Sequence, residues 1–309
     1  MYPEPKDPSI LHLQADHRSS MVWEVGGGDN QRPRHRDPNN VKFPPLHPRM
    51  VPILQALRFD GVSRLSHIQI DWSLITALIE RWRSETHSFQ LPFGECTISL
   101  QDVRILLGLG IDGPAIFGFT SFEGGCDDYI QHVLGVKPGK EGMVGGRVKC
   151  TCLNKIFPSL PDDSSDLQLQ RYTQSYLLQL IGGVLFTDHS GDQVHCMYIP
   201  LIKDFQSCAK LSWGSAVLAF LYRELCKPCR KDIEENVGCI ILLQLWAWSR
   251  LPTLTPIPRG PSLNNEIIWG DLAGPHGLRN GYDASSGDTL SIVAYPFDTS
   301  WGEAYQMIR

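Results

Sequence analysis

The chain has 309 residues, of which 42% are hydrophobic and 20% are charged, a composition typical of a globular protein that buries a core. Its 28 Lys and Arg against 33 Asp and Glu give a formal net charge of −5, which argues against a basic patch dedicated to nucleic acid, although its 18 Arg could still gather on one face. The most apolar stretch, residues 238–248, is too short for a membrane span, and the N-terminus lacks the pattern of a signal peptide. Nine cysteines in a chain of this size indicate reduced thiols in the cytosol or nucleus.

Residues 1–47 differ from the rest of the chain in composition. Eight of the 22 prolines lie in the first 48 residues, beside three consecutive glycines at 26–28. Because proline fixes φ and lacks an amide donor, we predict an extended, flexible tail. Arg32, Arg34 and Arg36 are a candidate for nuclear import or phosphate contact, with a solvated linker as the favoured alternative.

The next segments show helical periodicity. Residues 48–58 predict a short helix, and apolar residues at three- and four-residue steps predict a longer helix over 66–84, begun by Ser66 or Asp71. Its buried stripe is Ile68, Trp72, Ile75, Ile79 and Trp82. Residues 96–98 suggest a short strand. Ser99 and Asp102 form a capping-box pattern before a helix that stops at Gly108 or Gly110.

Three further helices are predicted, over residues 168–186, 213–227 and 238–250, the last being the most apolar and therefore central to the core. Glycines at 182 and 183 either weaken the first of these helices or mark a close helix contact. Residues 110–165 are rich in glycine, and their pattern predicts no helix or strand. The prediction is a mainly α fold, a single helical domain over 48–309 with a few short strands.

The motifs tested for chemistry predict neither a catalytic set nor a metal or cofactor. Cys226 and Cys229 form a CxxC, but Cys150 and Cys152 are separated from it by about 75 residues and have the wrong spacing for a zinc pair, so buried free thiols are favoured. Residues 188–192 gather acid, imidazole and hydroxyl, which as sequence neighbours favour a turn over a triad. Residues 270–277 lack the other blocks of a metallophosphatase.

Four segments of the chain resemble the plant mobile domain. They are residues 78–95, residues 97–103 with 106–109, residues 212–226 and residues 242–252, in the family's order. The resemblance covers about residues 50 to 300, with Ser84 standing where the family usually has Pro and Ser249 where it often has Glu. It also implies that this chain is a C-terminally shortened member.

The resemblance implies a function through contacts. Relatives in the MAINTENANCE OF MERISTEMS group are nuclear and act in meristem maintenance and in silencing of transposable elements and genes. We therefore expect a non-enzymatic nuclear interaction domain with a protein partner, phosphatase-like or a paralogous plant mobile domain protein. Two alternatives stay open. One is a transposable-element-derived accessory protein that contacts DNA; the other, disfavoured, is the pyridoxal-dependent enzyme suggested by the family's aminotransferase-like label, for which none of the ten lysines has a cofactor motif.

Candidate binding residues lie in a polar turn and among the eight tryptophans. Each also has a structural interpretation, because the polar turn can cap a helix C-terminus and tryptophans on Leu-rich helices usually pack in the core. The candidates are Trp82, Arg83, Glu85, Thr86, His87, Trp213, Trp246 and Trp248.

Overall fold

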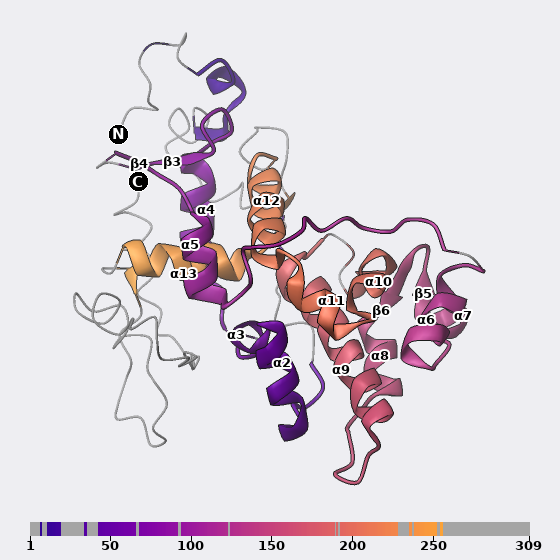
Figure 1. The fold of residues 1–309 in the computed structure, drawn as a ribbon. Coiled ribbons are helices and arrows are strands. Elements are labelled where there is room, and N and C mark those ends of the chain that lie inside the picture. Colours follow the sequence, from indigo (N-terminus) through magenta and orange to yellow (C-terminus); the bar gives the residue numbers. More distant parts are fainter. Residues whose placement is uncertain are drawn as a thin grey trace. The chain divides into compact units, whose positions relative to one another are not determined.

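The computed structural model describes residues 7, 11–19, 34–35, 43–65, 68–91, 94–122, 124–188, 190, 192–227, 235–236, 238–251 and 254–255. The predicted mainly α class is confirmed, because helices dominate and the strands are two to four residues long (Figure 1). Two compact units divide the chain. Unit 1 comprises Met1–Arg36, Ile68–Asp102 and Leu218–Arg309, and unit 2 comprises Asp37–His67 and Val103–Val217.

Unit 1 contains a helical pair and a small antiparallel sheet in the order β2-β3-β4, while β1 pairs with β8 in parallel. Helices α5 and α12 cross the boundary between the units. The elements are η1 (Gln14–Asp16), β1 (Arg34–His35), α4 (Trp72–Arg81), β2 (Trp82–Arg83), β3 (Ser88–Leu91), β4 (Gly94–Cys96), α5 (Leu100–Leu107), α12 (Trp213–Leu225), β8 (Glu235–Asn236) and α13 (Ile240–Arg250).

Helix α13 is the most deeply buried helix of unit 1, as its apolar sequence predicts. Every residue of 240–248 is buried, and the helix packs across α4 (Figure 1). The one polar side chain in that stretch, Gln244, donates to the Gln69 carbonyl at 2.8 Å and accepts from the Asp71 amide at 2.6 Å. Because a buried amide must find partners for both its donor and its acceptor, this pair of hydrogen bonds fixes α13 against the start of α4.

The start of α4 is at Asp71, one of the two predicted positions, and its carboxylate accepts from the Ser73 and Leu74 amides. The predicted end at Ser84 is wrong. The helix stops at Arg81, and Trp82 lies in β2, opposite Phe89 of β3. Helical spacing placed Trp82 on the buried stripe correctly, but pairing with a later strand, which local periodicity does not encode, decides its backbone conformation.

Two predicted features around α5 are confirmed. Ser99 and Asp102 exchange hydrogen bonds at its N-terminus, and Gly108 follows it in a left-handed conformation at φ 74°.

Within unit 2, a Cβ on Gly61 would lie 2.5 Å from the Leu107 carbonyl oxygen, so glycine allows the two backbones to approach.

Unit 2 packs helices around the antiparallel sheet β5-β6-β7. Several of its elements lie in residues 110–165, for which no helix or strand was predicted. The elements are η4 (Pro48–Met50), α2 (Val51–Leu57), α3 (Asp60–Ser63), α6 (Cys126–Leu134), α7 (Gly139–Gly142), β5 (Met143–Val144), β6 (Arg147–Lys149), α8 (Cys150–Ile156), α9 (Asp166–Leu180), η5 (Ile181–Leu185), β7 (Gln193–His195), η6 (Cys196–Tyr198), α10 (Ile199–Ile202) and α11 (Phe205–Lys210).

The long helix α9 is central to unit 2 and contacts α6, α10 and η4. It begins in a capping box of Ser165 and Gln168 and continues into the single π-turn η5, so the predicted helix over 168–186 has the right extent but changes type. A Cβ on Gly182 would lie 2.5 Å from a Val194 methyl of β7. The glycine therefore marks a close contact, which was one of its two interpretations.

A proline-containing segment, residues 43–50, lies along α9. Phe43 packs on Tyr176 with ring centroids 6.3 Å apart, and the Tyr172 hydroxyl donates to the Pro45 carbonyl at 2.9 Å. Arg49 donates to the Ser164 carbonyl at 2.6 Å. Most of the predicted tail lies outside the described residues, so its extended conformation stays a prediction.

Tyr176 makes the stability of unit 2 sensitive to alkali. Burial, with a smaller contribution from Tyr172, raises the pKa of Tyr176 to about 12, against about 10 in an unfolded chain. A raised folded-state pKa means that this stability is fully present below pH 10 and is lost as the pH rises toward 12. Between pH 8 and pH 11 we expect the free energy of unfolding in urea to fall by about 1.4 kcal/mol from this group. Tyr176→Phe should lack that part of the loss; an identical pH profile for both proteins would contradict the assignment.

Candidate functional site

Of the candidate binding residues, all but Trp213 belong to unit 1. Their exposure separates them into two groups. The four tryptophans and Arg83 are buried, each at most 3% exposed, whereas Thr86 and His87 are exposed and Glu85 is half-buried. The side chains of the turn are therefore accessible from solvent. The four tryptophans are inside the core, so their role is in packing.

Trp82 is the centre of an aromatic cluster in unit 1. Its ring lies 4.8 Å from Phe89 and 5.1 Å from Tyr222, measured between centroids, and its indole N–H points to the Cys226 sulfur at 3.3 Å. Phe89 in turn lies 4.9 Å from Trp246. Tilted and edge-on rings at these separations are the favourable geometry for aromatic packing, so the cluster joins the hairpin to α12 and α13.

Residues 11–19 cover the β2–β3 hairpin. His17 Nε2 donates to the Trp82 carbonyl at 2.7 Å, which leaves Nδ1 as the acceptor for Arg83 Nη1 at 3.1 Å. The Leu13 amide donates to the Glu85 carboxylate at 2.8 Å. Arg83 and Glu85 thus hold residues 11–19 against the hairpin. No motif in the sequence predicted this contact.

The turn of the hairpin presents His87 on the surface. His87 has a φ of 50°, uncommon for a residue with a side chain, and its ring stacks on Tyr222 at 5.6 Å with planes 5° apart. Thr97 Oγ1 donates to the His87 carbonyl at 2.6 Å. Burial raises the pKa of the Tyr222 phenol, which therefore stays protonated at neutral pH and donates to the Ile98 carbonyl.

Trp213 is a core residue of unit 2. Phe59 meets its ring edge-on at 5.2 Å, and its indole N–H donates to the Cys208 carbonyl at 3.1 Å. Trp248, in unit 1, is 3% exposed. Both positions agree with the core interpretation that the sequence allowed for them.

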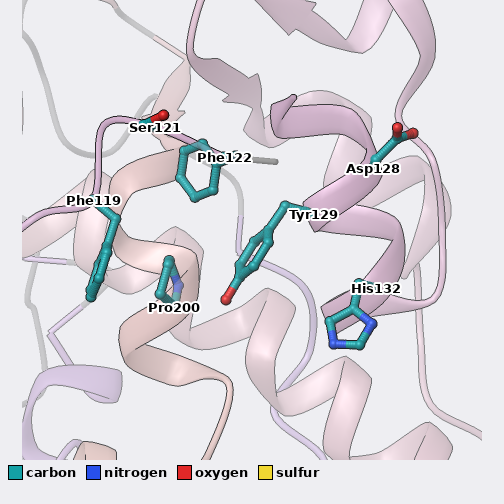
Figure 2. Close-up of a pocket in the computed structure, with 7 residues that line it drawn as sticks. All are labelled: Phe119, Ser121, Phe122, Asp128, Tyr129, His132 and Pro200. Carbon is teal, nitrogen blue, oxygen red and sulfur yellow. The ribbon is translucent and has the colours of Figure 1, made fainter. Parts of the chain in front are cut away.

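A groove in unit 2 contains residues that the sequence did not single out. It encloses about 480 Å³ and is open to solvent. Figure 2 shows Phe119 on one side and Tyr129 on the other, with Pro200 between them and Phe122 above. The lining residues are Phe119, Ser121, Phe122, Asp128, Tyr129, His132 and Pro200.

Glycine and backbone pairing shape one wall of this groove. The Phe119 amide donates to the Met197 carbonyl at 3.3 Å, and a Cβ on Gly118 would lie 2.8 Å from the Met197 sulfur. Gly125, at φ 91°, then turns the chain into α6, which supplies Tyr129. The segment before α6 is thereby held beside η6 and α10.

The groove has both apolar and polar side chains in its lining. Phe119, which lines the groove, is a large apolar side chain that is 50% exposed. Burial raises the pKa of Tyr129, so its hydroxyl is a donor at neutral pH, and Asp128 pairs with Lys137. Among the residues with described positions, no three His, Cys, Asp or Glu side chains gather in a way that could hold a metal ion.

The predicted turn at residues 188–192 is only partly described. Asp188 accepts from the Ser190 amide at 2.8 Å and from Arg147 Nε at 3.2 Å. Burial opposes ionisation, but the hydrogen bonds from Ser190 and the charge of Arg147 outweigh it and lower the pKa of Asp188. The carboxylate thus has a structural role, while His189 and residues 270–277 lie outside the described residues.

The model of one protein family matches this chain. The family is described as the plant mobile domain, and the match spans residues 59–274. No solved structure matches the chain. In the part of the chain that the structure describes, no helix is both long and apolar enough to cross a membrane.

Curated relatives come from Arabidopsis thaliana. One, named "Serine/threonine-protein phosphatase 7 long form homolog", is 43% identical over 81% of this chain and 18% of its own length. "Protein MAIN-LIKE 2" is 37% identical over 86% of this chain and 39% of its own length, and "Protein MAINTENANCE OF MERISTEMS" is 31% identical over 72% and 47%. The chain therefore corresponds to less than half of each of these proteins.

Trp82 should contribute to stability more than to direct contact. Replacing it with Ala removes a fully buried indole, so we expect the free energy of unfolding to fall by about 3–5 kcal/mol in urea denaturation. His87→Ala, an exposed neighbour in the same hairpin, should cost less than about 1 kcal/mol. Unchanged stability of the Trp82 variant would show that the aromatic cluster does not hold unit 1 together.

Proposed function

The chain belongs to the plant mobile domain family, and on that premise we propose that it acts as a non-enzymatic nuclear interaction domain. We propose that it acts in meristem maintenance and in the silencing of transposable elements and genes. The names of the relatives, among them "Protein MAINTENANCE OF MERISTEMS", support this assignment of the process.

The observation that carries the proposal is the aromatic groove of unit 2. Phe119 is half exposed and lines a hollow that also contains Phe122 and Tyr129 (Figure 2). Exposed aromatic side chains that surround a concave surface are typical of contact sites, because covering them removes apolar area from water at little cost in side-chain entropy. Tyr129 and His132 add polar atoms that can orient a partner.

The partner that we propose is a phosphatase-like protein. The support is the relative named "Serine/threonine-protein phosphatase 7 long form homolog", in which a region 43% identical to this chain occupies 18% of the length. A paralogous plant mobile domain protein is the second partner to be tested.

Binding through the groove can be measured directly. The purified chain is titrated with the purified phosphatase 7 long form homolog and, separately, with the MAIN-LIKE 2 protein. Phe119→Ala should weaken binding about 30-fold, since a central aromatic contact typically contributes about 2 kcal/mol. Leu167→Ala is the matched control, because Leu167 is 54% exposed on α9 of the same unit and does not line the groove.

Two outcomes would contradict this function. Equal affinity of the Phe119 and Leu167 variants would remove the groove from the interaction. Failure to bind either protein, together with DNA binding whose affinity falls steeply with salt, would favour the accessory protein derived from a transposable element.

Nuclear location is tested separately in plant cells. The chain is fused to a reporter too large to diffuse through nuclear pores, and we expect the fusion to accumulate in nuclei. Replacing Arg32, Arg34 and Arg36 together with Ala should shift it to the cytosol if this segment directs import, because import signals depend on clustered positive charge. A wild-type fusion that stays in the cytosol would overturn the nuclear assignment.

A further inference from the structure

The groove of unit 2 combines aromatic rings with an acidic stretch of sequence. Residues 119–132 supply six of its seven described lining residues, and Pro200 supplies the seventh. Three acidic residues, Glu123, Asp127 and Asp128, lie in that stretch, which contains neither Lys nor Arg. Asp128 itself lines the groove. An apolar surface and negative charge therefore coincide there.

The aromatic rings lie on several sides of the hollow. Phe122 and Tyr129 have ring centroids 5.1 Å apart and planes inclined at 43° to each other. Figure 2 shows Phe119 on the opposite side from Tyr129, with Pro200 between them and Phe122 above. A cation is attracted to ring faces within about 6 Å of their centroids, and one position in the hollow can meet that limit for two rings so close together. This arrangement is that of an aromatic cage.

Backbone hydrogen bonds fix the positions from which the rings project. The Phe119 amide donates to the Met197 carbonyl at 3.3 Å, three residues before Pro200. The Tyr129 amide donates to the Gly125 carbonyl at 3.2 Å, in the first turn of α6. Side chains on a fixed backbone have less freedom to lose when a ligand enters, so the entropic cost of binding is reduced.

The charge around the groove favours a cationic ligand. The first turn of α6 contains both Asp127 and Asp128, and Lys137 Nζ pairs with Asp128 Oδ1 at 2.5 Å. Over residues 119–137 the three acidic residues stand against this single Lys, so the stretch stays negative after the pair has formed. The negative faces of the rings add to the attraction for a positive group.

The existing ion pair decides which cation fits best. A lysine ammonium or an arginine guanidinium would bring several N–H donors into the groove and would compete with Lys137 for Asp128. Aromatic rings accept such donors only weakly, so removing these groups from water would be costly. A trimethylated ammonium keeps the positive charge, has no N–H to satisfy, and presents methyl groups to the rings and to Pro200.

We propose that the protein partner presents a trimethylated lysine and that the aromatic groove takes its side chain. This depends on the proposed function, because the same groove makes the contact. The groove encloses about 480 Å³, within the range of small-ligand sites, and is open to solvent. The cationic head group can therefore enter the hollow while its aliphatic stem leads back to the partner.

The binding test uses three small probes and no partner protein. They are the Nα-acetyl amides of Nε-trimethyllysine, of unmodified lysine, and of a neutral analogue in which a tert-butyl group replaces the trimethylammonium. Each probe is titrated into the isotope-labelled full-length chain, and the dissociation constant is taken from the shifts of the amide resonances. Trimethyllysine should bind about fivefold or more tightly than either of the others, because it alone combines the positive charge with a weakly hydrated head group.

Variants of Tyr129 and Asp128 separate ring and charge from apolar volume. Tyr129→Leu keeps an apolar side chain without a ring, so it should weaken trimethyllysine binding about fivefold, while Tyr129→Phe should bind like wild type. Asp128→Asn should weaken trimethyllysine binding about threefold and leave the neutral analogue unchanged. Asp163→Asn, which removes an exposed carboxylate of unit 2 that does not line the groove, is the matched control and should behave like wild type.

Four results would contradict the trimethyllysine assignment. Absence of binding by any probe removes the site, and equal affinity for the neutral analogue shows apolar contact without selection of a cation. Equal affinity for unmodified lysine shows attraction to negative charge alone. Unchanged affinity of Tyr129→Leu places the binding elsewhere. The amide spectrum of each variant without ligand confirms that it is folded, so misfolding cannot produce the losses that we expect.

The ligand and the partner are tested independently of each other. If the phosphatase 7 long form homolog binds through Phe119 but trimethyllysine does not bind, the groove is a protein contact site that does not select a methylated lysine. If trimethyllysine binds and neither protein does, the ligand assignment stands and the partner assignment is wrong.

Discussion

The burial of Trp82 at the point where α4 ends is the constraint on which unit 1 depends. A helix that continued past Arg81 would lose the strand pairing that places Trp82 opposite Phe89. The indole instead fills a space bounded by side chains from β3 and α12, and its backbone carbonyl accepts from His17. Ring packing and this buried hydrogen bond both favour the strand, and they outweigh the helical preference of the preceding residues.

The sequence predicted those parts of the fold that local chemistry determines. Periodicity located α12 and α13 to within a few residues, and the Ser99–Asp102 pattern identified the start of α5. The parts that it did not predict depend on contacts between distant residues. Helix α8, for example, begins where the Asp192 carboxylate accepts from the Thr151 amide, 41 residues away.

The same distinction applies to the candidate site. Trp82 and Trp246 were recognisable as large apolar residues on periodic segments, and their burial follows from that pattern. The groove was missed because its walls come from residues 119–132 and from Pro200, which only tertiary packing brings together.

Several acidic side chains in the described parts of the chain hold the backbone by accepting hydrogen bonds from its amides. Asp71 and Asp204 cap helices, and Asp102 caps α5 while it also pairs with Arg250. A carboxylate occupied in this way is poorly placed for acid–base work, because protonating it would cost the helix its cap. The exposed faces of the aromatic side chains in the groove, by contrast, do not hold the backbone. The part of the groove that solvent reaches is therefore largely apolar, which is what the proposed contact with a partner requires.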